Sequence, residues 1–166
     1  MKKINTILDQ NQIKKIVKRI AYQIHEKNNQ ESHVFLIGIH KNGFLLAQLI
    51  NKELQLISNS IIELCTLKIN KKNPQNNPHC DIDISKMKNK SVVLIDDVLN
   101  SGKTLIYAVK YILDVPLSKF NTSVLIDRNH KKFPIKIDFK GISLSTSIEE
   151  NVNVVFENNK SYAFID

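Results

Sequence analysis

One stretch of fifteen residues limits the possible folds of this chain more than any other feature. Residues 91–105 read SVVLIDDVLNSGKTL: an apolar run, two carboxylates, a turn of small residues and the start of a helical pattern. Such an apolar run is typical of a strand buried in a parallel sheet. Asp96 and Asp97 would then stand at the carboxyl end of the strand, where open α/β sheets bind ligands. The stretch therefore predicts an α/β fold with a mainly parallel sheet and a ligand site at that edge.

The turn after the two carboxylates has the properties of an anion site. Its backbone N–H groups would converge on one point, and the dipole of the following helix favours negative charge there. Acids beside an anion site suit a sugar phosphate, because hydroxyls donate to carboxylates while phosphate accepts from amides. A divalent cation would ease the remaining repulsion. The residues of this turn are Asn100, Ser101, Gly102, Lys103 and Thr104.

Residues 91–105 are also compatible with a nucleotide-binding loop, a receiver-like fold or a plain turn. The run from Ser101 to Thr104 resembles the end of a Walker A loop, but that motif has a glycine five residues before Gly102, where this chain has Asp97. A receiver-like fold also ends a strand in paired acids, yet nothing in it requires the turn that follows. A turn with a purely structural role would place no ligand here. All three possibilities stay open at the level of the sequence.

A second strand-turn-helix unit precedes the first. The apolar run 34–37 leads to GIHKNG at residues 38–43, and a helical pattern begins at Phe44. This turn is basic and rich in amides, so it could hold another phosphate group by the same physics. Two such units together suggest a ligand with phosphates at both ends. The residues of the second turn are His40, Lys41, Asn42 and Gly43.

Length and composition restrict the class of protein. With 166 residues the chain fits one domain, spanning 1–166, that buries a core without disulfides. Cys65 and Cys80 match no metal-ligand spacing, and no 18-residue apolar segment or export leader is present. We therefore expect a reduced, cytoplasmic protein without a membrane partner. The net charge of +8 accompanies heavy use of lysine, asparagine and isoleucine, so it gives little support for an anionic partner.

Periodicity predicts the remaining elements. Asp9 to Gln12 resembles a helix capping box, and apolar residues then recur at helical spacing as far as Ile24. The opposite face of this helix is basic, which usually means only that it is solvated; the other interpretation is contact with nucleic acid. Apolar strands alternating with helices favour a parallel sheet. We expect strands at residues 34–39, 61–69, 92–95 and 124–127, and helices near 44–57 and 103–114.

Two parts of the chain lack this alternation. Residues 68–83 have no periodicity at their centre, so they form either a mobile loop that closes over the site or a plain surface excursion. After residue 130 the pattern changes to short segments, which we expect to form a small cap beyond the main sheet. These segments are residues 131–135, 139–142, 152–156 and 162–165.

Together these residues resemble a type I phosphoribosyltransferase, in particular the pyrimidine operon attenuator/uracil phosphoribosyltransferase family. Residues 93–104 match the phosphoribosyl-pyrophosphate loop that all type I members share, and residues 124–135 match the more diagnostic hood. The resemblance implies a mainly parallel sheet flanked by helices, with a small hood formed mainly by residues 127–150. It also implies a need for Mg²⁺ and assembly into homodimers or larger homo-oligomers.

The resemblance also implies roles for the matching positions. Asp96 and Asp97 would bind the ribose hydroxyls and act in catalysis, and Asn100 to Thr104 would bind the 5′-phosphate. The turn His40–Gly43 would bind pyrophosphate, and Mg²⁺ would arrive with the substrate, with no direct protein ligand assigned. The remaining positions are Lys68, Lys71 and Lys72 in the closing loop, Asp127 and Arg128 near the base, and Lys15, Lys18, Arg19, His130 and Lys131 for contact with RNA.

The chain departs from the family at several of these positions. Purine-specific relatives have an acid where Asn100 stands, so a 6-oxopurine is a less suitable base. The family usually has arginine where Asn42 and Ile69 stand, and lysine replaces only the charge of a bidentate donor. Ile148 stands where regulators of the family often carry lysine.

We therefore expect a phosphoribosyltransferase that transfers ribose 5-phosphate from phosphoribosyl pyrophosphate to a nucleobase, a pyrimidine such as uracil, and releases pyrophosphate. The alternative is a nucleotide-sensing regulator of pyrimidine genes that binds RNA and has weak or no catalysis.

Overall fold

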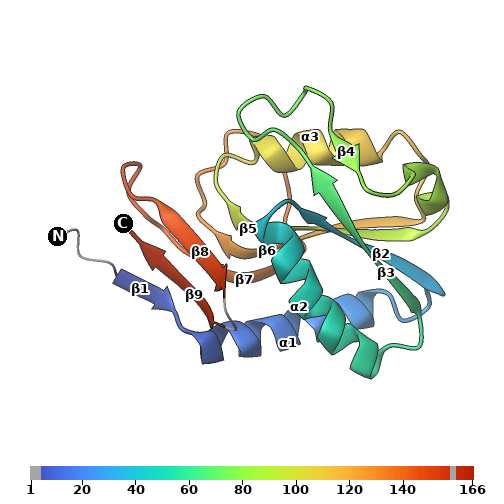
Figure 1. Ribbon diagram of the computed structural model, residues 1–166, viewed down its shortest axis with the longest axis horizontal. Coiled ribbons are helices and arrows are strands. Elements are labelled where there is room, and N and C mark those ends of the chain that lie inside the picture. The colour runs from blue at the N-terminus through green and yellow to red at the C-terminus, as the bar shows by residue number, and fades with distance from the viewer. Residues whose placement is uncertain (1–4, 158–159) are drawn as a thin grey trace.

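The computed structural model describes residues 5–157 and 160–166, so residues 1–4, where no export leader was expected, lie outside it. Its centre is a six-stranded sheet with helices on both faces, and a three-stranded sheet stands at one end (Figure 1). The predicted α/β class with a mainly parallel sheet is confirmed. The strands of the main sheet are β2 (His33–Ile39), β3 (Ile61–Lys68), β4 (His79–Cys80), β5 (Ser91–Leu99), β6 (Lys119–Asp127) and β7 (Phe139–Ser143).

The order of the strands places the two predicted turns side by side. The order is β4-β3-β2-β5-β6-β7, and every neighbouring pair is parallel except β3 and β4. The chain leaves β2 toward β3 and leaves β5 toward β6, so the direction of winding reverses between β2 and β5. Ligands bind to open α/β sheets at such a reversal, outside the carboxyl ends of the strands.

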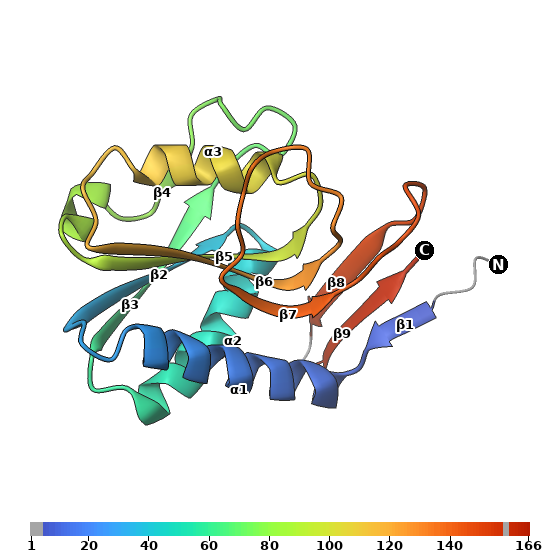
Figure 2. The same ribbon diagram turned by 180° about the vertical axis from the view of Figure 1, so that it is seen from behind.

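Side chains along each strand alternate between two apolar layers. In β2, Val34 and Leu36 pack in the layer that α1 and α2 cover, whereas Phe35 and Ile37 pack in the layer that α3 covers. The two views show α1 and α2 on one face of the sheet and α3 on the other (Figures 1 and 2). The helices are α1 (Gln10–Lys27), α2 (Asn42–Ile57) and α3 (Lys103–Ile112).

The first helix begins at the predicted capping box. The backbone N–H of Gln12 donates to Asp9 Oδ1 at 2.8 Å, and that of Asp9 donates to Gln12 Oε1 at 2.8 Å. Farther along, Arg19 donates to the carbonyls of Lys140 at 3.1 Å and Gly141 at 2.6 Å, which joins α1 to β7. Arg19, on the basic face of the helix, therefore has a structural role.

The carboxyl-terminal segments differ from the predicted cap. β8 (Val152–Glu157) and β9 (Lys160–Ile165) form an antiparallel hairpin, and β1 (Asn5–Leu8), which was not predicted, pairs with β9. The expectation that residues 139–142 belong to a cap beyond the main sheet is wrong, because β7 pairs in parallel with β6. β7 is a half-buried edge strand, so its sequence lacks the continuous apolar run of a central strand.

The predicted closing segment lies between β3 and β5. It contains the loop 69–78, the two-residue strand β4, which was not predicted, and a 3₁₀ helix at Ile84–Met87. Cys65 in β3 and Cys80 in β4 are buried and free. Among the described residues, no helix combines the length and apolar character needed to cross a membrane.

Candidate functional site

The two predicted carboxylates are buried in the last part of β5. Asp96 is 2% exposed and Asp97 is 8% exposed. The backbone N–H of Asp97 donates to Asp96 Oδ1 at 2.9 Å, and Nζ of Lys71 lies 3.6 Å from the same oxygen. Burial and the neighbouring charge of Asp97 raise the pKa of Asp96 to about 8, and the Lys71 ammonium opposes this rise only in part. An acid with this pKa is mostly protonated at neutral pH, and such a shifted pKa is typical of functional sites.

The turn of residues 100–104 follows β5 and leads into α3, and we call it the phosphate loop after the ligand predicted for it. Gly102 adopts a φ of +83° at the start of α3, a conformation that favours glycine. The N–H groups of Lys132 and Phe133 both donate to the carbonyl of Ser101, so the hood segment lies against this loop. A hollow of about 70 Å³ remains, lined by Lys71, Asp96 and residues 98–105. The structure therefore places the loop residues Asn100 to Thr104 beside the carboxylates.

The second predicted turn lies at the neighbouring strand end. His40 and Lys41 are exposed, and the backbone N–H of His40 donates to the carbonyl of Leu67 in β3 at 2.9 Å. A Cβ on Gly43 would lie 2.6 Å from the carbonyl oxygen of Ile95, so only glycine lets the start of α2 approach β5 this closely. This approach brings the turn His40–Gly43 next to the two carboxylates.

The side chain of Asn42 points inward from this turn. Its Nδ2 donates to Asp97 Oδ2 at 2.9 Å and to the carbonyl of Val154 in β8 at 2.9 Å. Sequence reasoning placed Asn42 in the site but did not find this contact, because Val154 lies 112 residues away along the chain.

The closing loop 69–78 lies over the same edge of the sheet. Besides the contact between Lys71 and Asp96, Nζ of Lys103 donates to the carbonyl of Lys72 at 3.4 Å. Lys68, at the end of β3, is exposed. The loop therefore contacts both the carboxylates and the first residue of α3.

Arg128 joins the hood to the phosphate loop. It is 8% exposed, and its Nη1 donates to Asn100 Oδ1 at 2.8 Å. Its other donors reach Thr146 Oγ1 and the carbonyls of Ser147 and Glu150, at distances from 2.7 to 3.2 Å. The guanidinium thus fixes the segment 144–150 against the end of β6. The sequence carried no signal for these partners.

Asp127, beside Arg128, is also buried, at 2% exposed. Its Oδ1 accepts from the backbone N–H of Asn129 at 2.9 Å, and its Oδ2 lies 3.5 Å from Nζ of Lys140. Because β6 pairs with β5, Asp127 lies opposite Leu99, next to the start of the phosphate loop. The structure therefore brings both residues predicted near the base to the edge that holds the carboxylates.

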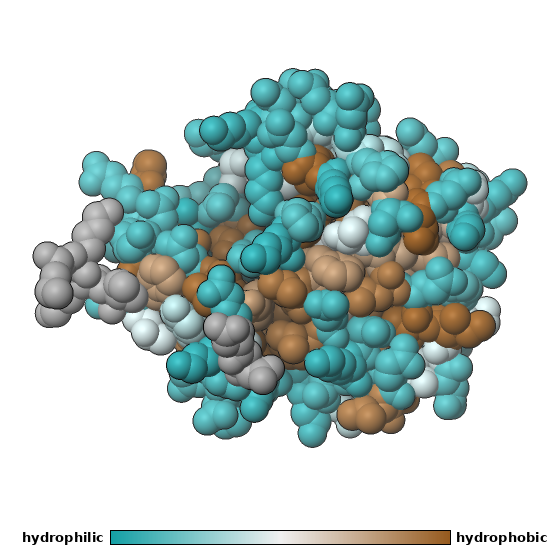
Figure 3. Space-filling view, in the orientation of Figure 1, coloured by the Kyte–Doolittle hydropathy of each residue, from teal (hydrophilic) through white to brown (hydrophobic). Residues whose placement is uncertain are grey.

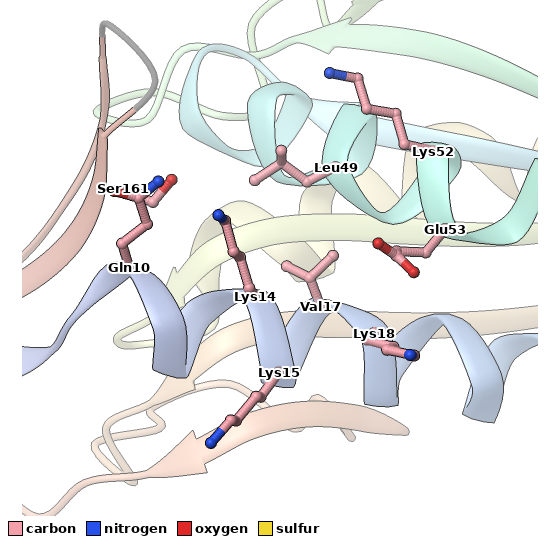
Figure 4. A pocket seen from close by; sticks show the side chains of 9 residues that line it. All are labelled: Gln10, Lys14, Lys15, Val17, Lys18, Leu49, Lys52, Glu53 and Ser161. Atoms are coloured by element: carbon pink, nitrogen blue, oxygen red, sulfur yellow. The ribbon is translucent and has the colours of Figure 1, made fainter.

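The basic residues predicted for RNA contact are divided between two places. Lys15 and Lys18 are exposed on α1, while His130 and Lys131 follow β6. A hollow of about 560 Å³ lies between α1, α2 and β9 (Figure 4). In this view Lys14 points into the space between the two helices, and Lys15 points away from it.

The comparisons with known proteins agree with this geometry. A model of the phosphoribosyl transferase domain matches residues 3–158. The "Bifunctional protein PyrR" of Caldicellulosiruptor saccharolyticus is 33% identical over 95% of this chain and 91% of its own length. The protein of the same name from Fusobacterium nucleatum is 32% identical over 92% and 90%.

Solved structures show the same fold. A hypoxanthine-guanine phosphoribosyltransferase from Bacillus anthracis superposes with a TM-score of 0.79 at 17% identity, covering 98% of this chain and 96% of that one. The hypoxanthine phosphoribosyltransferase of Trypanosoma cruzi gives 0.78 at 14% identity, covering 96% and 95%. Because the domain model matches most of the chain and relatives above 30% identity match nearly all of it, the chain belongs to the phosphoribosyl transferase domain family, as its resemblance to type I members indicated.

Proposed function

We propose that this protein transfers ribose 5-phosphate from phosphoribosyl pyrophosphate to a pyrimidine base and releases pyrophosphate. The observation that carries the proposal is the meeting of two carboxylates with two turns at the carboxyl ends of neighbouring strands. Asp96 and Asp97 lie between the loop 100–104 and the turn His40–Gly43. A sugar with a phosphate at each end matches this order of acceptors and donors.

Each part of the substrate then has a partner in this chain. Asp96 and Asp97 would accept hydrogen bonds from the ribose hydroxyls, and the N–H groups before α3 would hold the 5′-phosphate. The turn His40–Gly43, with Lys41, would face the pyrophosphate. Lys68, Lys71 and Lys72 of the closing loop would add positive charge over the leaving group. Asp127 and Arg128 would lie beside the base.

The chemistry needs stabilisation of positive charge on the ribose. Transfer of the ribosyl group passes through an oxocarbenium-like state, and buried carboxylates next to the ring stabilise it because the local dielectric is low. Asp96 and Asp97 supply such groups. Their burial beside the loop 69–78 also limits access of water, which would otherwise compete with the base.

The acidic pair also fits Mg²⁺ that enters with the substrate. Among the described residues, no cluster of three or more His, Cys, Asp or Glu side chains could hold a metal ion by itself. Lys71 compensates the negative charge of the two adjacent carboxylates only in part, and a hydrated cation on the pyrophosphate would reduce the charge that remains. When bound, the ion would neutralise charge on the leaving pyrophosphate.

Asn100 supports a pyrimidine over a purine as the base. Its Oδ1 already accepts from Arg128, and an amide cannot act as the general base that an acid provides at this position in purine-specific relatives. Uracil is the base we favour. The names of the curated relatives do not state a base, so the choice depends on Asn100 and on the family resemblance of the hood.

An assay of pyrophosphate release tests the proposal. The protein is given phosphoribosyl pyrophosphate and Mg²⁺ together with one base at a time. We expect release with uracil and little with hypoxanthine or guanine. Asp97→Asn should lower the rate strongly, whereas Asp114→Asn, at an exposed position just after α3, should not. If phosphoribosyl pyrophosphate neither binds nor raises the melting temperature of the wild type at millimolar concentration, the site assignment is wrong.

RNA binding is a second candidate function. Relatives at 32–33% identity are named "Bifunctional", which is consistent with a second activity besides catalysis. Within the described part of the chain, Lys15 and Lys18 are exposed and form no ion pair, so both could contact phosphates. Arg19 contributes less, because two carbonyls of β7 hold its guanidinium. His130 and Lys131 would add contacts from the hood.

Filter binding tests this function. Leader RNA of pyrimidine genes is compared with a scrambled RNA at two salt concentrations. Log affinity should fall with log salt by about 0.7 for each single-stranded phosphate contact. A pyrimidine nucleotide should change the affinity for leader RNA only. Equal affinity for both RNAs, with no effect of the nucleotide, would refute the regulatory function and would not affect the proposed enzymatic function.

Self-association is also part of the proposal. Leu56 is 79% exposed and Ile61 is 62% exposed, on either side of the turn between α2 and β3. Figure 3 shows hydrophobic groups gathered in the middle of the face that carries α2, with hydrophilic groups around them. Sedimentation of the wild type and of Leu56→Lys would test whether this protein forms a homodimer or a larger homo-oligomer.

A further inference from the structure

The side-chain amide of Asn42 connects the candidate catalytic pair to the small sheet. It is the first residue of α2 and is partly buried, and both acceptors of its Nδ2 are oxygens: Oδ2 of Asp97 and the carbonyl of Val154, each at 2.9 Å. Because neither acceptor can donate, the orientation of the amide is fixed. The side chain therefore spans β5 and β8 with both of its hydrogens in use.

This arrangement leaves Asn42 little capacity to bind a phosphate group. Binding pyrophosphate through Nδ2 would require it to release a buried carboxylate or a strand carbonyl, and an acceptor left without its donor is costly. The side chains of Lys41 and His40 in the same turn are exposed and form no hydrogen bond or ion pair with the residues that the structure describes. The pyrophosphate contacts of the turn would therefore come from these residues and from backbone N–H groups.

Asn42 and Lys71 approach the carboxylate pair from different elements. Lys71 belongs to the closing loop, its side chain is 51% exposed, and it contacts Asp96. Asn42 belongs to a helix that Gly43 holds tightly against β5, and it contacts Asp97. Movement of the loop would separate Lys71 from Asp96, whereas the contact between Asn42 and Asp97 would persist.

We propose that Asn42 is a positioning residue, whose amide holds the Asp97 carboxylate in place for the ribose and joins it to the β8–β9 hairpin. This inference rests on the proposed function of the site. It assigns Asn42 to the ribose and the turn around it to the pyrophosphate. If the amide positions Asp97, its removal weakens binding of the ribose part of the substrate. If the amide instead binds phosphate, its removal weakens binding of pyrophosphate.

Calorimetric titration of the whole chain separates these two roles of Asn42. The three ligands are ribose 5-phosphate, phosphoribosyl pyrophosphate and pyrophosphate, each titrated with Mg²⁺. Asn42→Leu removes both donors at similar volume, and Asn42→Asp keeps the shape but opposes Asp97 with an acid. Both should weaken ribose 5-phosphate and phosphoribosyl pyrophosphate by about tenfold or more, as expected for a lost hydrogen bond to a charged group. In the neutral variant Asn42→Leu, pyrophosphate affinity should stay within about twofold. Asn42→Gln keeps an amide donor, so its affinities for ribose 5-phosphate and phosphoribosyl pyrophosphate should lie between those of the other two variants and those of the wild type.

Gln48→Ala, an exposed change two turns along α2, is the matched control and should leave all three affinities unchanged. Loss of pyrophosphate affinity in Asn42→Leu, equal to the loss for ribose 5-phosphate, would show a phosphate ligand or a general distortion and would overturn the inference. Unchanged affinity for all three ligands in both variants would overturn it too. Failure of the wild type to bind any of them would instead refute the proposed function.

Discussion

Arg128 Nη1 donates to Asn100 Oδ1 at 2.8 Å, so one buried guanidinium links the end of β6 to the phosphate loop. The same side chain holds Thr146 and the carbonyls of Ser147 and Glu150. The loop that would bind the 5′-phosphate and the hood that would cover the base therefore share one support.

Arg128→Met should release this support. The change removes several hydrogen bonds from a buried guanidinium to acceptors that are exposed or only partly buried, so we expect a loss of unfolding free energy of about 1.5–3 kcal/mol. Urea denaturation measures this loss, and hydrogen exchange should become faster in residues 144–150. Lys110→Met, at an exposed position of α3, is the control. Unchanged exchange in the segment would show that the hood does not depend on Arg128.

The stability of the protein should depend on pH through Asp96. Burial and the charge of Asp97 raise its pKa from 3.8 to about 8, so the folded state binds a proton more tightly than the unfolded state. The stabilising contribution of the protonated acid is complete below about pH 4 and is lost as pH rises toward 8. Over this window the unfolding free energy should fall by about 1.4 kcal/mol per pH unit from this group.

Asp96→Asn tests this dependence, because the amide is neutral at every pH. Urea denaturation at pH 5, 7 and 9 should show the variant gaining stability relative to the wild type as pH rises. Asp83→Asn provides a contrast, since Asp83 is exposed and hydrogen bonds to Ser85 lower its pKa. Parallel pH profiles for wild type and Asp96→Asn would show that Asp96 ionises normally.

The sequence predicted those parts of the site that lie within one strand-turn-helix unit. Asp96, Asp97 and the loop 100–104 follow one another along the chain, so their order alone indicates a sugar phosphate site. The turn at 38–43 was found for the same reason. The assignment of these residues to particular parts of the substrate is still a prediction, which the binding experiments test.

Contacts between distant segments could not be predicted. Asn42 reaches Val154 and Arg128 reaches Thr146 only because the sheet brings these segments together. β7 was missed as a strand of the main sheet because an edge strand buries few of its side chains, so its pattern resembles that of a loop. β1 has four residues and gains its pairing only from β9, at the other end of the chain.

The closing loop should become ordered when substrate binds. Lys71 already contacts Asp96, and Lys103 contacts the backbone of Lys72, so small changes in the site should alter the loop. We expect phosphoribosyl pyrophosphate with Mg²⁺ to slow hydrogen exchange in residues 68–79, and Lys71→Met to reduce this protection. Lys88→Met, exposed and outside the loop, is the control. Equal exchange with and without ligand in the wild type would show that the loop is not a lid.

Gly102→Ala should damage both stability and phosphate binding. The φ of +83° costs about 1 kcal/mol for a residue with a Cβ, and that Cβ would lie 2.7 Å from Cγ2 of Ile135 in the hood. The double variant Gly102→Ala with Ile135→Ala removes the contact but keeps the backbone cost. Compared with Ile135→Ala alone, the double variant should therefore lose only the backbone cost of about 1 kcal/mol, whereas Gly102→Ala should cost the wild type more. Binding of inorganic phosphate, followed by calorimetry, should be weaker in both variants that carry Gly102→Ala, because the N–H groups of the loop no longer converge. Phosphate affinity equal to that of the wild type in Gly102→Ala would mean that the loop 100–104 does not hold the phosphate.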